Sequence, residues 1–184
     1  MNIAIIGAGS LGAVYAARLA LSGQDVTCID VDEEHVRAFN ENGLRYEWQG
    51  NVTNIPMRAT ADPTAAPPAD VALIAVNAYS TAEAAESART VLHEDGYAVT
   101  LQNGLGNVEV LQAALGSQRV VGGICFVSGM LTGPGAVKQT GCDSTHIGEL
   151  DKSHSARITE LAEVLQAAEL CPVIDDDIMN IVWG

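Results

Sequence analysis

The N-terminus joins an apolar run to a glycine-rich turn and then to an alanine-rich segment. Residues 1–6 read MNIAII, residues 7–12 read GAGSLG, and residues 13–21 are mostly alanine and other apolar types. A G-x-G-x-x-G motif between a strand and a helix is typical of a dinucleotide-binding βαβ unit. The order of strand, turn and helix therefore predicts an α/β fold with a parallel sheet. The alternative is a structural turn that binds nothing.

Each glycine of this loop has a distinct expected role. Gly7 permits a tight turn, Gly9 leaves room for a pyrophosphate, and Gly12 lets the helix approach the strand. No lysine or arginine occurs in residues 1–17. The unpaired N–H groups and positive dipole end of the helix would therefore hold the phosphates.

A second predicted strand, residues 25–30, ends in Asp30. Asp30 follows the loop at close to the ~20-residue spacing at which a carboxylate accepts hydrogen bonds from the adenosine ribose. It would repel a 2′-phosphate, and Val31 supplies no arginine to hold one, so NAD(H) is favoured over NADP(H). In the alternative, Asp30 or Asp32 only caps the next helix, residues 33–40. Asp32 can do this alone, which leaves Asp30 free.

The remaining pattern predicts a Rossmann-type, doubly wound and mostly parallel sheet with helices on both faces. Strands are expected at 69–76, 96–101, 119–128 and 144–149, with helices at 82–92, 108–115 and 153–168. Residues 44–57 read as a small β excursion, and 129–141 as a turn-rich stretch with a hairpin at 134–135. Ser80 or Thr81 is expected to cap a helix.

Ligands of open α/β sheets bind beyond the carboxyl ends of the strands. Residues 77–81, directly after one predicted strand, are therefore expected to face the cofactor. Asn103 follows the next strand, and its amide can both donate and accept hydrogen bonds. Asn103-Gly104 is equally a common turn dipeptide.

Composition excludes several classes of function. Nine basic against 23 acidic residues give a net charge of −14, which disfavours nucleic acid and anionic membrane partners. Hydrophobic residues make up 48% but aromatics only 4%, a profile typical of helices packed on a parallel sheet. With no leader pattern and no long apolar run, we expect a cytoplasmic protein.

The cysteines and histidines indicate no further chemistry. Cys28, Cys125, Cys142 and Cys171 lie far apart, without the spacing of a metal site or a redox pair. No metal is therefore expected. His146 and His154 have no carboxylate partner at a defensible spacing, so neither is expected to be catalytic.

Residues 178–184 read as the start of a last helix. Its apolar residues have no partner later in the chain, which predicts a homo-oligomer formed through this exposed helix. The expected division is a dinucleotide-binding domain at 1–174, followed at 175–184 by the start of a linker helix to a C-terminal helical domain that this chain lacks.

Five short motifs coincide in this chain: Gly7-Ala8-Gly9-Ser10-Leu11-Gly12, Val76-Asn77-Ala78-Tyr79, Asn103-Gly104-Leu105-Gly106, Thr145-His146-Ile147-Gly148 and Ile181-Val182-Trp183. Together they resemble the ketopantoate (2-dehydropantoate 2-) reductase family. The resemblance covers the whole chain but only the cofactor-binding, N-terminal half of the family. Asn-Gly-x-Gly together with the terminal tryptophan is its specific part.

That family reduces the ketone of 2-dehydropantoate to pantoate with a nicotinamide hydride, a step of pantothenate biosynthesis. The resemblance implies that the partner is a small 2-oxo acid. It assigns cofactor contacts to Gly7, Ala8, Gly9, Ser10, Leu11, Gly12, Asn77 and Ser128. It also implies that Asn103 contacts the nicotinamide ribose and the substrate, which makes Asn103 the expected catalytic-site residue.

Two departures bear on activity. Asn77 stands where the family commonly has a lysine, which removes a cation from the expected site. The family's general-acid lysine and C-terminal helical domain would follow Gly184. We therefore expect a fragment or truncated product that binds dinucleotide and turns over poorly. Two other hypotheses are a related dehydrogenase of another 2-oxo acid or an opine-like substrate, and a non-catalytic NAD(H)-binding module.

Overall fold

The computed structural model describes residues 1–183. Gly184 and the side chain of Trp183 lie outside the described part. The strands are β1 (Asn2–Ile6), β2 (Asp25–Ile29), β3 (Leu44–Trp48), β4 (Asn51–Ile55), β5 (Arg58–Thr60), β6 (Ala69–Ile74), β7 (Leu92–Thr100), β8 (Val120–Gly133), β9 (Ala136–Glu149) and β10 (Pro172–Ile174).

The α-helices are α1 (Ser10–Leu21), α2 (Glu33–Asn42), α3 (Thr81–Val91), α4 (Asn107–Leu115), α5 (Ala156–Ala167) and α6 (Ile178–Trp183). Three short 3₁₀ turns connect them: η1 (Pro63–Ala65), η2 (Ala78–Ser80) and η3 (Ser117–Arg119).

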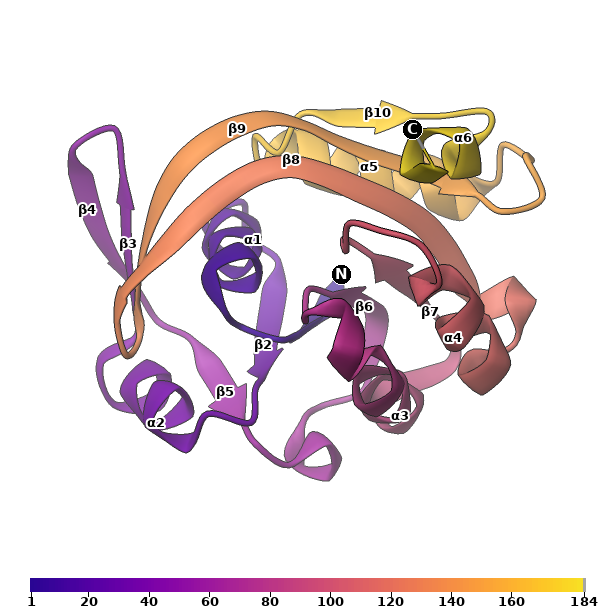
Figure 1. Cartoon of the computed structure of the whole chain (residues 1–184). Coiled ribbons are helices and arrows are strands. Elements are labelled where there is room, and N and C mark those ends of the chain that lie inside the picture. The colour runs from indigo at the N-terminus through magenta and orange to yellow at the C-terminus, as the bar shows by residue number, and fades with distance from the viewer. Residues whose placement is uncertain (184) are drawn as a thin grey trace.

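All strands belong to one 10-stranded sheet (Figure 1). Its order is β4-β3-β9-β8-β7-β6-β1-β2-β5, with β10 paired to β9. Among the strands of residues 1–183, the β3–β4 and β8–β9 pairs are antiparallel and the others are parallel. β1 lies between β2 and β6, so the chain turns in opposite directions on the two sides of β1. This arrangement confirms the expected doubly wound, mostly parallel sheet.

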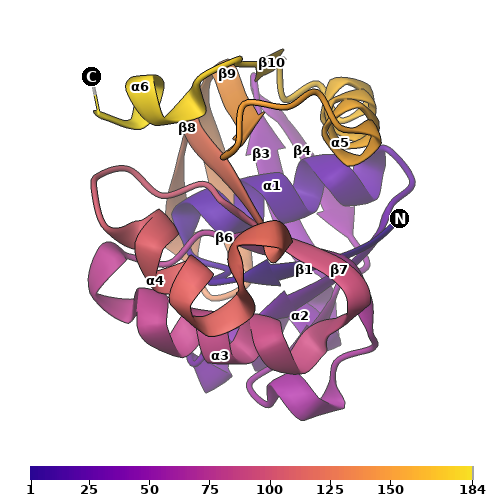
Figure 2. The same ribbon diagram turned by 90° about the vertical axis from the view of Figure 1, so that its right-hand side faces the viewer.

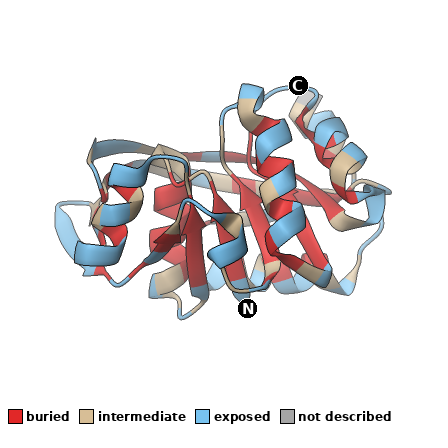
Figure 3. Cartoon of the chain, turned by 90° about the horizontal axis from the view of Figure 1, so that it is seen from below, coloured by how far each residue is buried: buried red, intermediate tan, exposed pale blue. Residues whose placement is uncertain are grey.

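Helices cover both faces of the sheet (Figures 1 and 3). Alternate residues of β1 point to opposite faces, as the pleat requires. Ile5 packs in a cluster with Tyr15 and Leu19 of α1, whereas Ile6 packs with Ala85 of α3 and Leu111 of α4. The alanine-rich sequence predicted this close packing of helices on strands.

The β8–β9 hairpin corrects one expectation. Residues 129–141 were expected to be turn-rich, but β8 and β9 form one long antiparallel pair that arches over α1 (Figure 1). Only the turn at Pro134-Gly135 is as predicted. Gly129 serves packing, because a Cβ there would lie 2.7 Å from Val14 Cγ2 and 2.9 Å from the Ser10 carbonyl oxygen.

The last helix also differs from expectation. Ile178 of α6 is buried against the sheet, and a Cβ at Gly122 or Gly148 would lie 2.8 Å from its side chain. The expectation that this helix is exposed is therefore wrong for Ile178. Ile181 is exposed, with 37% of its surface accessible. Figure 2 shows α6 lying next to β8 and β9.

None of the described helices is both long enough and apolar enough to cross a bilayer.

Substitution of Gly12 tests the contact between α1 and β1. A Cβ at Gly12 would lie 1.9 Å from the Gly7 carbonyl oxygen. We expect Gly12→Ala to lower the free energy of unfolding by at least ~2 kcal/mol, as in overpacked cores. Gly9→Ala is the control: its Cβ meets nothing within 4 Å, and we expect a loss below ~1 kcal/mol. Equal urea midpoints for the two variants would contradict this packing.

An ion pair between buried Glu149 and half-buried Arg157 joins β9 to α5. Arg157 Nη2 lies 2.6 Å from Glu149 Oε2, and Ser155 donates to the same carboxylate. Burial raises the pKa of Glu149, but the hydrogen bonds from Arg157 and Ser155 outweigh it and hold this pKa below its ordinary value. The ionised Glu149 carboxylate therefore contributes to the free energy of unfolding above about pH 4.5. This contribution is lost as the pH falls through the pKa of Glu149 in the folded chain.

We expect Glu149→Gln to lower the free energy of unfolding at pH 7 by ~1–3 kcal/mol. Its stability should also depend less on pH between about pH 5 and 3 than that of the unaltered chain. Urea unfolding at a series of pH values measures both effects. The control is Glu86→Gln, which removes an exposed pair with Arg89 and should change stability little. Parallel pH profiles for Glu149→Gln and the unaltered chain would refute this account.

Candidate functional site

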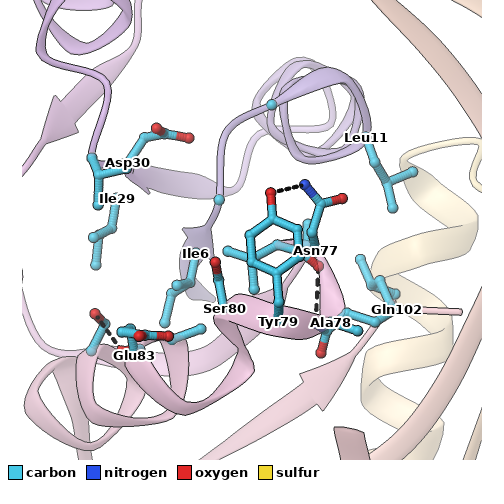
Figure 4. A pocket seen from close by; sticks show the side chains of 18 of the residues that line it. Ile6, Leu11, Ile29, Asp30, Asn77, Ala78, Tyr79, Ser80, Glu83 and Gln102 are labelled. Atoms are coloured by element: carbon cyan, nitrogen blue, oxygen red, sulfur yellow. Dashed lines mark hydrogen bonds between the residues drawn. The ribbon is translucent and has the colours of Figure 1, made fainter. Parts of the chain in front are cut away.

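A cavity of about 900 Å³ opens beyond the carboxyl ends of β1, β2, β6 and β7 (Figure 4). It lies where the strand order reverses around β1, the position at which open α/β sheets bind ligands. Its polar lining residues include Ser10, Asp30, Asn77, Tyr79, Ser80, Glu83, Gln102 and Asn103. The structure thus brings together predicted residues from four separate strand ends.

The glycine loop forms one wall of the cavity. Gly7 has φ +87° and donates its N–H to the Ile29 carbonyl oxygen at 2.9 Å. Gly9 lines the cavity, and a Cβ there would meet no atom within 4 Å. Gly9 also precedes α1, whose N-terminus has no side-chain cap. The first turn of α1 therefore presents backbone N–H groups and its positive dipole end beside the cavity.

Asp30 stands at the edge of the same cavity. Its Oδ2 accepts a hydrogen bond from the Ala8 N–H at 2.6 Å, and its Oδ1 accepts one from the Asp32 N–H at 2.9 Å. Asp32 caps α2 by accepting from Glu34 and His35. The expectation that Asp32 alone does the capping is therefore confirmed. Each Asp30 oxygen retains acceptor capacity for a further donor, such as a ribose hydroxyl.

The ends of β6 and β7 carry the amide side chains of the site. Asn77 donates from Nδ2 to the Tyr79 hydroxyl at 2.9 Å, and both residues line the cavity (Figure 4). Asn103 is exposed and also lines it. The backbone carbonyl oxygen of Asn103 accepts a hydrogen bond from Asn107 Nδ2 at 3.3 Å.

A buried hydrogen-bond network, in which Gln102 lines the cavity and Thr81 and Asn107 lie behind it, was not predicted from the sequence. Gln102 donates from Nε2 to the Val76 carbonyl oxygen and to Thr81 Oγ1, each at 2.9 Å. Thr81 in turn bonds to Asn107 Oδ1. The expected helix cap is wrong: Ser80 makes no side-chain cap, and Thr81 is already inside α3. Only the position of Gln102 directly after a strand could have indicated its role.

Four predicted residues do not line the cavity: Ala8, Gly12, Thr81 and Ser128. Ala8 and Gly12 are buried within the loop, so they contribute backbone geometry. Ser128 lies on β8, where its hydroxyl accepts a hydrogen bond from Thr140 Oγ1 at 3.0 Å. The cofactor contact assigned to Ser128 stays a prediction.

His146 and His154 both have carboxylate partners, contrary to expectation. His146 Nδ1 lies 2.7 Å from Asp175 Oδ2, and its Nε2 lies 3.1 Å from Ser144 Oγ. His154 Nε2 lies 2.8 Å from Asp176 Oδ1. The pairing of β10 with β9 brings this distant acidic segment back to the sheet. Neither histidine lines the cavity.

Charge in the cavity is negative. Asp30 and Glu83 line it, and among its described lining residues none is a lysine, arginine or histidine. An anionic ligand group would therefore be held by backbone N–H groups and by the dipole of α1. Backbone N–H groups at a helix N-terminus can hold a pyrophosphate in this way. The carboxylate of Asp30 can accept hydrogen bonds from ribose hydroxyls.

Comparison with known proteins agrees with this geometry. A family model described as ketopantoate reductase PanE/ApbA matches residues 3–152. The 2-dehydropantoate 2-reductases of Pyrococcus abyssi and Pyrococcus horikoshii are 32% and 33% identical to the chain over all of its residues. The chain spans 59% of the length of each of these relatives.

A solved structure shows the same fold. The crystal structure of 2-dehydropantoate 2-reductase from Geobacter metallireducens superposes with a TM-score of 0.92 at 31% identity. The match covers 100% of this chain and 60% of that one. By fold, by motif and by family model, this chain belongs to the ketopantoate reductase PanE/ApbA family.

Proposed function

We propose that this chain is the NAD(H)-binding part of an oxidoreductase that reduces the ketone of a 2-oxo acid. By analogy with its relatives, the proposed substrate is 2-dehydropantoate and the product is pantoate. The observation that carries the proposal is the cavity at the switch point of the sheet. Its walls combine an uncapped helix N-terminus, the open side of Gly9 and the carboxylate of Asp30.

The residues present fit a dinucleotide along the length of the cavity. We assign the pyrophosphate to the N–H groups of the loop and the first turn of α1, beside Gly9. Asp30 would accept hydrogen bonds from the adenosine ribose and repel a 2′-phosphate. Asn103 and Asn77, at the ends of β7 and β6, would contact the nicotinamide ribose and position the substrate ketone.

Reduction adds a hydride to the carbonyl carbon and a proton to the carbonyl oxygen. NADH held by the glycine loop and Asp30 would supply the hydride. A proton donor must lie beside the developing alkoxide, and we assign that donor to no described residue of the cavity. The resemblance places a general-acid lysine directly after Gly184, outside the described residues. We therefore propose that the described residues bind the coenzyme and orient the substrate, and that the proton donor is not one of them.

Asn77 favours a second candidate, a reductase of the same group with a different 2-oxo acid substrate. Its amide carries no charge, and its Nδ2 is engaged by the Tyr79 hydroxyl. An amide and a phenol would hold a substrate through neutral hydrogen bonds in place of a lysine ion pair. Comparing 2-dehydropantoate with other 2-oxo acids separates the two candidates. NADH binding without oxidation by any 2-oxo acid favours a non-catalytic module.

Substitution of Gly9 tests where the pyrophosphate binds. We expect Gly9→Ala to weaken NADH binding moderately and Gly9→Val to weaken it more than about tenfold, because the added carbons occupy the open space beside the loop. NADH fluorescence titration measures the Kd, and circular dichroism checks that each variant is folded. An unchanged Kd for a folded Gly9→Val chain would refute this placement.

Substitution of Asp30 tests coenzyme preference. We expect Asp30→Ala, alone or with Val31→Arg, to weaken NADH binding about tenfold and to strengthen NADPH binding. Asp30→Asn is the matched control for the loop, because it keeps a carbonyl acceptor for the Ala8 N–H while removing the charge. It should mainly relieve the repulsion of NADPH. Tighter binding of NADPH than of NADH by the unaltered chain would show that Asp30 does not set the preference.

A further inference from the structure

A buried histidine joins the glycine loop to the tip of the β8–β9 hairpin. His35, on the first turn of α2, has only 3% of its surface exposed. Its Nε2 lies 2.8 Å from the Ala8 carbonyl oxygen, and its Nδ1 lies 3.0 Å from the Gly135 backbone nitrogen. Each ring nitrogen therefore makes one hydrogen bond, Nε2 to the glycine loop and Nδ1 to the hairpin tip.

The two partners fix the protonation of the ring. The backbone N–H of Gly135 can only donate, so Nδ1 must be the unprotonated acceptor. Nε2 then carries the hydrogen and donates to the Ala8 carbonyl oxygen. These two hydrogen bonds orient the ring, and Phe39 packs against it with ring centroids 4.4 Å apart. A neutral imidazole of one tautomer thus fits between the two segments.

Both peptide groups that flank Ala8 make hydrogen bonds to side chains. Asp30 accepts from the Ala8 N–H at 2.6 Å, and His35 donates to the Ala8 carbonyl oxygen. The C=O of Ala8 and the N–H of Gly9 belong to one trans peptide group, in which they point in opposite directions. Since the carbonyl points to His35, the Gly9 N–H points away from it, and Gly9 lines the cavity.

We propose that His35 is a positioning residue for coenzyme binding. It fixes the peptide between Ala8 and Gly9 so that the Gly9 N–H is held ready for the pyrophosphate. Through Gly135 it also ties this peptide to the hairpin tip, where a Cβ on Gly135 would lie 2.8 Å from the Ala38 side chain. The inference rests on the proposed NADH site and adds the residue that orients its loop.

Three variants test the role of His35. His35→Gln retains one N–H donor and one carbonyl acceptor, whereas His35→Leu retains neither. Phe39→Leu is the matched control, because it disturbs the packing around the imidazole but removes neither hydrogen-bonding group. We expect His35→Leu to raise the Kd for NADH about tenfold, equivalent to about 1.4 kcal/mol. His35→Gln and Phe39→Leu should stay within about twofold of the unaltered chain, although Phe39→Leu loses stability.

A spectroscopic measurement on the unaltered chain is independent of these variants. The ¹⁵N chemical shifts of the His35 ring should show an unprotonated Nδ1 and a protonated Nε2. The opposite tautomer, or a charged ring at pH 7.5, would overturn the proposal even if His35→Leu failed to fold.

The binding data separate the inference from the proposed function. NADH binding that is the same in folded His35→Leu as in the unaltered chain overturns the inference alone. The same holds if Phe39→Leu weakens binding as much as His35→Leu, because the effect would then follow general stability. Failure of the unaltered chain to bind NADH would overturn the proposed function, and with it the coenzyme role of His35.

Discussion

The close approach of α1 to β1 is the contact on which the site depends. A Cβ on Gly12 would lie 1.9 Å from the Gly7 carbonyl oxygen, so the backbones of the helix and the turn meet without an intervening side chain. The N-terminus of α1 therefore begins directly beside the carboxyl end of β1. Its uncapped N–H groups face the cavity, which supports holding a pyrophosphate without a lysine or arginine.

The loop between β1 and α1, together with the first residue of α1, makes hydrogen bonds to three other parts of the fold. Asp30 after β2 holds the Ala8 N–H, His35 of α2 holds the Ala8 carbonyl, and Ser10 Oγ accepts from the Leu131 N–H of β8 at 3.2 Å. Each such hydrogen bond contributes only about 1 kcal/mol net. Together they fix the loop before a ligand arrives, which reduces the entropy lost on binding.

Features of the fold and site that depend on neighbouring residues could be predicted from the sequence. Contacts between residues far apart along the chain could not. Strand β1, the loop, α1 and the place of Asp30 depend on neighbouring residues, so period and spacing predicted them. The contact between His35 and Gly135 joins residues 100 positions apart, and that between His146 and Asp175 joins residues 29 apart. Gly129 of β8 suggested a turn because its role, to leave room for α1, depends on packing between distant elements.

The most direct test of the account is to follow the backbone amide signals of the chain by NMR during titration with NADH. We predict saturable shifts of Gly9, Ser10 and Leu11 at the loop and first turn of α1, while Val52 on the distant β4 strand stays unchanged. Saturable binding that shifts other amides and leaves those three unaffected would contradict the account, as would no binding at millimolar NADH.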